Sequence, residues 1–558
     1  MLKKPNRNTF MQLSSHGTIQ HTGAEGMSRY NTATKARPAQ KSSAIKAGTK
    51  PKTNPQGGIG FKRGDAKSEL FLSAATSFMQ PKFYETESDL RARQRKLIAK
   101  VAVSDPEWTF EFLTWLRTEG NLRTGSLTLA ADAVRERLKA GKTGWNRQII
   151  STVLRRPDEP GEMLAYWTTN YGRNVPISVK RGIADVIEGQ YNERNFLKYD
   201  SASRAFRFGD VIELTHPKMT GSRGDLASYA ITVGKGHDAE IPSSLSMIRK
   251  NRNLRQWTPG EIVERAKYRG DDLMPLSDVL SAAGMTWEDI PALVNGPWTP
   301  ELWEAAIPNM GVMALMRNLR NFDQVGISKQ AAKMVRDKLS DPEAVRKSRI
   351  LPLRALSAYK AVSNSRWHGA LEDAVDITLD NVPALKGRTL ILVDCSGSMF
   401  FGNGTDLSYA ESAAVFGTAL AAKAEKATLV HYGSSSREVP VPRGASVLEM
   451  ARSVHSMGGT ATAAAIQQHY NGHDRVILLT DEQHNGGGYG WGSRYVSQNP
   501  SDYVPKHIPL ITFNLAGYKL GGVKDGPNRL TFSSLSDSAW KLVDMFGNGM
   551  SGWPWEAN

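Results

Sequence analysis

The sequence predicts two kinds of structure in succession: an array of α-helices, followed by a doubly wound α/β domain. Between residues 64 and 387, apolar residues recur at helical spacing in segments of roughly 10 to 18 residues, separated by short Gly, Pro or Asn turns. From residue 388 onward, short apolar runs that end at an aspartate alternate with helical stretches, which is typical of a parallel sheet covered on both faces. With 558 residues, the chain is long enough for each part to have its own core.

The helical part carries clear boundary signals. A helix is predicted over 88–103 with Ser88 as its N-cap, and Pro106 opens the next helix in its first turn. Further helices are predicted over 125–140, 145–154, 160–171 and 176–191. Short connections between helices of this length favour antiparallel pairs, so we predict a degenerate HEAT-like array. Because no strict sequence period is present, a helical domain of another topology is the alternative.

The α/β part is organised around Thr389 to Met399, TLILVDCSGSM. Its apolar residues predict a buried parallel strand, 389–393, which leaves Asp394, Ser396 and Ser398 at the carboxyl end. That end is where open α/β sheets bind ligands. The predicted elements that follow are a helix over 407–427 and strands over 428–432 and 510–515.

Two later segments place further oxygen ligands at the same edge. Thr460 follows Gly458-Gly459, and Asp481 ends a second apolar strand that begins at Arg475. Carboxylates and hydroxyls are hard donors that suit Mg²⁺ or another divalent cation. The predicted metal ligands are Asp394, Ser396, Ser398, Thr460 and Asp481. This pattern resembles the metal-ion-dependent adhesion site of von Willebrand factor A domains, a resemblance that implies a site for binding a partner's carboxylate and not for catalysis.

Charge is concentrated outside this α/β domain. The formal net charge is +16, which predicts an acidic partner, nucleic acid first and an anionic membrane second. Residues 1–63 carry 12 Lys and Arg against the single acid Glu25, a net +11, and we expect this tail to be largely disordered. It is equally consistent with a nucleic-acid-binding arm and with a solubilising tail. Residues 388–558 carry 13 basic and 14 acidic residues and are close to neutral.

Three separated stretches, in a fixed order before the metal loop, resemble the Ro autoantigen family. They are GDVIELTHPK (209–218), WEAAIPNMGVMALMRNLRNF (303–322) and LPLRALSAYKAV (351–362). In that family a TROVE module of helical repeats precedes a von Willebrand A domain. The resemblance therefore implies a bacterial or phage-borne Ro-like protein with three regions: a basic tail (1–63), a TROVE-like helical ring (64–387) and an A-like domain (388–558).

The same resemblance implies an RNA-binding scaffold in RNA quality control or processing. Family members bind small noncoding Y RNAs and the single-stranded 3′ ends of misfolded RNAs. His216 matches the family's RNA-contacting histidine motif, and planar or cationic side chains nearby have the right chemistry for bases and phosphates. The candidate RNA-binding residues are His216, Lys218, Arg204, Arg207, Lys198, Lys180 and Arg181. For His216 the alternative is a helix-end role beside Pro217, and for Lys180 and Arg181 it is a solvated helix face.

Other classes are less favoured. The sequence has no phosphate-binding P-loop, no paired cysteines for zinc and no HExxH or GxSxG motif, so we expect a protein that is not an enzyme. Cys395 is the single cysteine, and no apolar run of 18 or more residues occurs, which favours a cytoplasmic protein without a membrane anchor. We expect a monomeric ring with an exoribonuclease such as polynucleotide phosphorylase as a candidate partner. The alternative function is a protein-binding assembly module that acts through the metal site.

Overall fold

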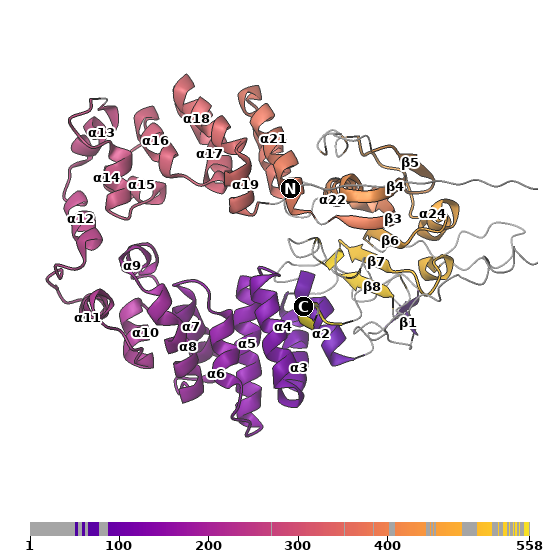
Figure 1. Cartoon of the computed structure of the whole chain (residues 1–558), viewed down its shortest axis with the longest axis horizontal. Helices are drawn as coiled ribbons and strands as arrows, with labels where there is room; N and C mark the ends of the chain where they lie inside the picture. Colours follow the sequence, from indigo (N-terminus) through magenta and orange to yellow (C-terminus); the bar gives the residue numbers. More distant parts are fainter. Residues whose placement is uncertain are drawn as a thin grey trace, which may run out of the picture. The chain divides into compact units, whose positions relative to one another are not determined.

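The computed structural model describes most of the chain from residue 65 onward (Figure 1). The described residues are 51–53, 59–61, 65–76, 87–268, 270–350, 352–382, 384–400, 408–441, 453–481, 499–515, 528–532 and 552–556, with single positions 447, 450, 523, 535, 540, 542, 543 and 546. Contacts divide the chain into residues 1–42 and residues 43–558, so the helical array and the sheet belong to one compact unit. Most of the predicted basic tail lies outside the described residues; its last part contributes the antiparallel strands β1 (Pro51–Thr53) and β2 (Ile59–Phe61).

Helices follow one another from residue 66 to residue 378, as the apolar periodicity predicts. The first group is α2 (Ala66–Thr76), α3 (Glu87–Ser104), α4 (Pro106–Thr118), α5 (Arg123–Lys139), α6 (Asn146–Val153), α7 (Glu159–Tyr171), α8 (Ile177–Gln190), α9 (Glu193–Tyr199), α10 (Phe208–Thr215) and α11 (Ser222–Gly234). The second group is α12 (Ser246–Leu254), α13 (Pro259–Lys267), α14 (Leu276–Ala282), α15 (Ile290–Val294), α16 (Pro300–Ala306), α17 (Val312–Val325), α18 (Lys329–Leu339), α19 (Pro342–Ser348), α20 (Pro352–Ala361) and α21 (His368–Thr378).

Local signals set several of these boundaries. Pro106 occupies the first turn of α4, where a missing N–H costs nothing, and the Asp105 side chain accepts from the Trp108 N–H as the cap. Thr258 and Glu261 form a reciprocal capping box at the start of α13. The two tryptophans of α4, Trp108 and Trp115, are 6% and 5% exposed, because residues seven apart share one helix face. They belong to the core that neighbouring helices form together.

The last region is a six-stranded sheet with the order β5-β4-β3-β6-β7-β8. Its strands are β3 (Leu385–Asp394), β4 (Ala424–Tyr432), β5 (Ser436–Val439), β6 (Arg475–Thr480), β7 (Leu510–Asn514) and β8 (Arg529–Phe532). All neighbouring pairs are parallel except β4 and β5. The predicted doubly wound α/β architecture is thereby confirmed, with an antiparallel strand at one edge.

Residues of β3 alternate between two cores, which is the period-2 consequence of a sheet covered on both faces. Ile391 and Val393 pack into the core that includes α22 (Tyr409–Lys423). Leu390 and Leu392 pack into the other core, with Ile466 of α24 (Thr462–His469). The predicted helix over 407–427 is too long at its C-terminal end: α22 ends at Lys423, because Ala424 already pairs with Leu385 of β3.

An aromatic cluster joins the first helices to the end of the chain. The Phe71 ring of α2 lies 5.5 Å from the Trp553 ring, and the Trp108 ring of α4 lies 5.1 Å from it. Trp555 stacks parallel to Trp553 with an interplanar angle of 5°. Burial of aromatic surface of this kind stabilises contact between segments that are distant in sequence.

Among the helices of the described residues, none combines the length and the apolar character that a membrane span requires.

Candidate nucleic-acid groove and metal-site loops

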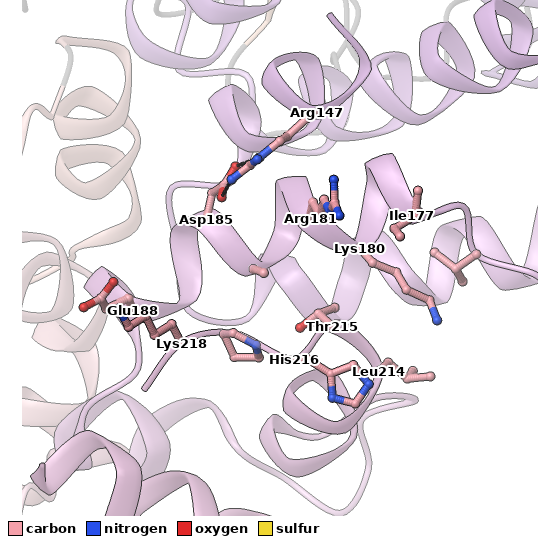
Figure 2. A pocket seen from close by; sticks show the side chains of 13 residues that line it. Arg147, Ile177, Lys180, Arg181, Asp185, Glu188, Leu214, Thr215, His216 and Lys218 are labelled. Carbon is pink, nitrogen blue, oxygen red and sulfur yellow. Dashed lines mark hydrogen bonds and ion pairs between the residues drawn. The ribbon is translucent and has the colours of Figure 1, made fainter. Parts of the chain in front are cut away.

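A surface groove of about 640 Å³ runs along the exposed face of α8 (Figure 2). One side is the helix face that carries Ile177, Lys180 and Arg181 in its first turns. The opposite side is the end of α10 and the segment after it, which includes His216 and Lys218. The complete lining is Arg147, Val175, Ile177, Lys180, Arg181, Ala184, Asp185, Glu188, Leu214, Thr215, His216, Pro217 and Lys218.

Close helix packing sets which face of α8 is exposed. A Cβ atom on Gly182 would lie 2.6 Å from the Arg147 carbonyl oxygen of α6, so only glycine permits this approach. Val179, Ile183 and Ile187 are fully buried. The face with Lys180 and Arg181 therefore lies outside this packed face and borders solvent.

The end of α10 fixes the other side of the groove. His216 caps α10 in the left-handed conformation, with φ 50°, and its N–H donates to the Ile212 carbonyl at 2.9 Å. Pro217 follows and cannot continue the helix. A left-handed residue is a common way to end a helix, and Asn295 and Arg349 end α15 and α19 in the same manner. The helix-end role predicted as the alternative for His216 is present, and its imidazole still lines the groove.

The groove gathers four of the seven predicted RNA-binding residues: His216, Lys218, Lys180 and Arg181. None of these four side chains takes part in an ion pair with another described residue. The one ion pair in the groove joins Arg147 to Asp185, with the Arg147 Nε to Asp185 Oδ2 distance at 2.6 Å (Figure 2). Cations without anionic partners are free to meet phosphates.

The other three predicted residues lie elsewhere, and two of them are engaged with acids. Arg207 donates from its Nε to Asp200 Oδ2 at 3.0 Å, and this carboxylate also accepts from the Phe208 N–H at 2.7 Å. Arg204 donates to Glu162 at 3.1 Å and to Asp158 at 3.3 Å. The Lys198 ammonium lies 5.5 Å from the Tyr199 ring centroid.

Arg204 belongs to a larger charged network around the start of α7. Glu159 is fully buried and accepts hydrogen bonds from Arg117 and Arg123, at 2.8 and 3.0 Å. Arg123 also donates to Asp158 at 2.8 Å. A buried carboxylate requires such partners, because its desolvation is otherwise costly. These arginines hold helices together.

Residues that the sequence interpretation missed also line the groove. Ile177 and Glu188 share the helix face of Lys180 and Arg181. Ile177 precedes Lys180 and Arg181 by 3 and 4 residues, and Glu188 follows Arg181 by 7 residues, a helical spacing that is visible in the sequence. An isoleucine in the first helical turn, directly after Pro176 and on a cationic face, is the signal that was available.

The predicted metal ligands lie on three loops at one edge of the sheet. Asp394 ends β3 and Asp481 follows β6, and these two strands are direct neighbours. Thr460 is on a loop tied to the Asp394 loop by the Gly397 N–H to Gly458 carbonyl hydrogen bond, at 2.8 Å. The Ser396 and Ser398 hydroxyl oxygens are 3.2 Å apart.

The electrostatics at this edge fit a cation. Asp394 is fully buried, and it accepts from the Ser396 N–H at 2.8 Å and from the Thr480 hydroxyl at 2.6 Å. Burial and the neighbouring Asp481 carboxylate raise the pKa of Asp394 to about 6. Two carboxylates this close disfavour each other's charge, and a divalent ion with oxygen ligands would remove that penalty.

Side-chain chemistry at this edge depends on hydroxyls as well as carboxylates. No group of three or more His, Cys, Asp or Glu residues suited to a metal occurs within the described ranges. Cys395 is fully buried, and burial raises the pKa of its thiol to about 12, so the thiol stays protonated. It is a small core side chain, as its position in the strand-to-loop transition predicts.

The fold defines a helical repeat protein joined to an α/β domain of the von Willebrand A kind. A family model described as the TROVE domain matches residues 280–375. The RNA-binding protein RO60 of Deinococcus radiodurans is 33% identical over 133 residues, which is 21% of this chain and 24% of that protein. The sequence match thus spans about a quarter of the relative's length.

The structure is also similar to the crystal structure of the Deinococcus radiodurans RO (RSR) protein. The TM-score is 0.65 at 18% sequence identity, and the match covers 87% of this chain and all of that one. At this identity the likeness establishes the fold. The TROVE match, the partial sequence match and the fold together make the chain similar to Ro proteins, the family that the order of its motifs predicts.

Proposed function

We propose that this protein binds RNA through the groove between α8 and the end of α10. The observation that carries the proposal is that one groove is lined by His216, Lys218, Lys180 and Arg181. None of these side chains is neutralised by an ion pair with another described residue. The name of the Deinococcus relative, an RNA-binding protein, supports it. By resemblance, the ligands are a structured small noncoding RNA of the Y type and single-stranded 3′ ends of misfolded RNAs.

In the same proposal, the protein is a scaffold in RNA quality control or processing in the cytoplasm. It acts as a monomer and does not itself cleave RNA, and an exoribonuclease of the polynucleotide phosphorylase type is the candidate partner. The α/β domain holds Mg²⁺ or another divalent ion with Asp394, Ser396, Ser398, Thr460 and Asp481. That ion would bind an acidic side chain of a partner protein.

The groove is tested by removing its cations together. The variant Lys180→Ala/Arg181→Ala/Lys218→Ala should bind a small hairpin RNA with a single-stranded 3′ tail about 10 to 100 times more weakly at 0.1 M salt. Because the logarithm of affinity falls by roughly 0.7 per contacted phosphate on a single strand, the slope against log salt should decrease in size by about 2. Fluorescence anisotropy over a salt series measures both quantities.

The matched control removes exposed lysines that lie in local ion pairs. Lys139→Ala/Lys267→Ala breaks two such pairs, with Glu136 and Glu264. It should change RNA affinity less than threefold. Equal weakening in the groove variant and the control would mean that overall charge, and not this groove, determines binding, and an unchanged affinity in the groove variant would reject the site.

The assembly-module alternative has its own supporting observation, the convergence of the five predicted metal ligands from three loops. A partner bound through the metal would be released by a chelator and would show little salt dependence, whereas RNA binding should be salt-dependent and unaffected by chelation. Co-purification from cell extract with and without chelator separates the two. Loss of all partners, RNA included, on chelation would favour the alternative.

A further inference from the structure

Strand β4 is covered on its outer edge over only part of its length. β5 is the outermost strand of the sheet and pairs with β4 from Leu429 to Tyr432 (Figure 1). The preceding part of β4, residues 424–428, pairs with β3 on one side and has no strand partner among the described residues on the other. Alternate N–H and C=O groups of an unpaired edge face outward, where another chain can pair with them.

Prolines explain why β5 stops short. Val439 lies opposite Leu429 in the antiparallel pair, so the residues after Val439 would have to continue the pairing toward Ala424. Pro440 follows directly, and Pro442 is next but one. Because proline has no N–H to donate to a ladder, β5 ends at Val439 and leaves the first part of β4 open.

The open part of β4 is accessible to solvent. Glu425, Lys426 and Ala427 are exposed, whereas residues 429–432 are buried. Consecutive strand residues point to opposite faces of a sheet, so exposure of three in a row means that both faces reach solvent here. The backbone of this part can therefore be approached by a further strand.

A cleft of about 500 Å³ adjoins this open edge, and we name it the β4 cleft. One wall is the first part of β4 and the other is the end of β5 with the residues after it, while alanines from the end of α22 also line it. Small side chains there leave room for the side chains of an added strand. The complete lining is Ala421, Ala422, Ala424, Glu425, Ala427, Thr428, Leu429, Glu438, Val439, Pro440 and Val441.

The β4 cleft is acidic. Glu425 and Glu438 are its charged lining residues, and neither forms an ion pair with a Lys or Arg of the described chain. Glu425 accepts from the Gly387 N–H at 2.8 Å, and the 66% exposed Glu438 side chain lies 3.2 Å from His469 Nδ1. Lys426 is absent from the lining, as expected for a residue between Glu425 and Ala427 on a strand. The charge of this cleft complements basic side chains.

We propose that the β4 cleft binds an extended, basic peptide segment of a partner protein, which adds to the sheet as a strand beside residues 424–428. Backbone hydrogen bonds to β4 provide affinity, and Lys or Arg side chains near Glu425 and Glu438 provide selectivity. A second copy of this chain is a poor occupant, because symmetric pairing of two β4 edges brings the same acidic side chains together.

This inference goes beyond the proposed function and does not depend on RNA binding. The cleft is also distinct from the metal-site loops. Ala424 pairs with Leu385 at the amino end of β3, whereas Tyr432 pairs with Asp394 at its carboxyl end. The peptide site and the predicted metal ligands therefore lie toward opposite ends of the strands.

The first experiment measures binding of a defined probe to the full-length protein. The probe is an eight-residue peptide of alternating lysine and valine with acetylated and amidated ends, so that it carries no carboxylate for a metal. Calorimetry should show that it binds about tenfold more tightly than two analogues: one N-methylated at every residue, which keeps the charge and loses the backbone donors, and one with glutamate in place of lysine. Addition of a chelator should leave the affinity unchanged.

Hydrogen–deuterium exchange locates the bound peptide. Amide groups in residues 424–428 that face outward should exchange about tenfold more slowly with the peptide bound, because pairing with a strand protects them. Residues 475–480 of β6, which already have strand partners on both sides, should show no change.

Two variants with matched controls test the lining. Ala422 is exposed at the end of α22, and Ala422→Trp should fill the cleft and abolish peptide binding, whereas Ala92→Trp at an exposed position of α3 should not. Glu425→Gln/Glu438→Gln keeps hydrogen-bonding capacity, removes the charge and should weaken binding about fivefold. Glu136→Gln/Glu264→Gln removes two carboxylates elsewhere and should change it less than twofold. Thermal melts establish that each variant is folded.

Several results would overturn strand addition at this cleft. They are no binding of the probe by the wild type, equal binding of the N-methylated analogue, unchanged exchange of residues 424–428, and unchanged binding by Ala422→Trp. Release of the peptide by a chelator would place it at the metal edge and would also reject the proposal. None of these measurements contains RNA, so each of them leaves the proposed RNA binding to its own test.

Discussion

The metal-site edge of the sheet and the groove of the helical array differ in how sequence determines a site. At the edge, Asp394 and Asp481 end neighbouring parallel strands, so the topology alone brings their loops together. In the helical array, seven cationic or imidazole residues had suitable chemistry, but four of them line the groove while Arg204 and Arg207 are paired with acids. Sheet topology can be inferred from strand order, whereas the partner of a helix-borne arginine depends on packing between helices.

This difference has a functional consequence. At the edge, Asp394, Thr460 and Asp481 are buried, and Asp394 is held by the Ser396 N–H, an orientation that would suit a metal ligand. In the groove, Arg181, His216 and Lys218 are exposed, Lys180 is half-buried, and none of the four forms an ion pair with another described residue, which suits a ligand with a repeating, mobile backbone. The two sites should therefore respond differently to substitution.

The largest expected effect is on metal binding. Asp394→Ala removes the buried carboxylate that we propose as a metal ligand and should lower Mg²⁺ affinity at least about 100-fold, since even partners that only orient a ligand contribute 10–100-fold. RNA affinity should stay within twofold of the wild type, because the groove contains none of the edge residues. Isothermal calorimetry with Mg²⁺ and anisotropy with RNA measure the two affinities.

A graded variant sharpens this comparison. The Thr480 hydroxyl donates to Asp394 at 2.6 Å. Thr480→Val should therefore leave the Asp394 carboxylate in place but remove the hydrogen bond that orients it, and Mg²⁺ affinity should fall about tenfold. A parallel fall of RNA affinity with Mg²⁺ affinity across the two variants would show that the sites are coupled and would break the comparison.

Much of the architecture could be predicted because the determining signals are local or periodic. The metal loop, the strand before it and the starts of α4 and α8 follow from apolar runs and from Pro106 and Pro176. The end of α22 could not, because an alanine-rich run favours helix, and only pairing with β3 makes Ala424 the start of a strand. Local propensity is overridden there by a contact 39 residues away, from Leu385 to Ala424.

The groove was half predictable for a related reason. His216 and Lys218 were found through a motif, and Lys180 and Arg181 through charge, but nothing in the sequence states that α8 and the end of α10 face each other. Ile177 escaped notice because an isoleucine in a helix is expected to be buried. Its exposure, which gives the groove its apolar end, is visible only when the packing of α8 is known.

The next effect is on stability and contrasts Arg207 with Lys180. Arg207→Ala leaves the Asp200 side chain, which is 2% exposed, without its cation, and should lower the free energy of unfolding by about 3 kcal/mol. Lys180→Ala should change it by less than about 0.5 kcal/mol, because Lys180 has no ion pair within the described residues. Urea unfolding of both variants measures these values. If Arg207→Ala leaves stability unchanged and weakens RNA binding, Arg207 belongs with the groove residues and the distinction drawn between them is wrong.

The last effect is a pH dependence of stability that arises in the sheet. His431 of β4 is 1% exposed, and neither ring nitrogen has a hydrogen-bond partner among the residues that the structure describes. Burial, together with the positive charge of Arg437 and the neighbouring His455, lowers the pKa of His431 to about 4. The unfolded chain therefore binds a proton at His431 near pH 6.5, whereas the folded chain binds it only near pH 4. The contribution of neutral His431 to the free energy of unfolding is complete above pH 6.5 and is lost as the pH falls toward 4. At about 1.4 kcal/mol per pH unit, the loss approaches 3 kcal/mol at pH 4 and is about 2 kcal/mol at pH 5.

The measurement must separate the effect of His431 from that of Asp394. Protonation of Asp394 changes the stability in the opposite direction over an overlapping pH range. Because the pKa of Asp394 is raised to about 6, its carboxylate makes the metal-free protein less stable as pH rises from about 4 to 6. The informative quantity is the difference in unfolding free energy between the wild type and His431→Phe at pH 7.5, 6 and 5. In the wild type relative to the variant, the free energy of unfolding should fall by about 2 kcal/mol from pH 7.5 to pH 5. A constant difference across this range would mean that solvent reaches His431, and that the sheet domain has no buried imidazole to protonate.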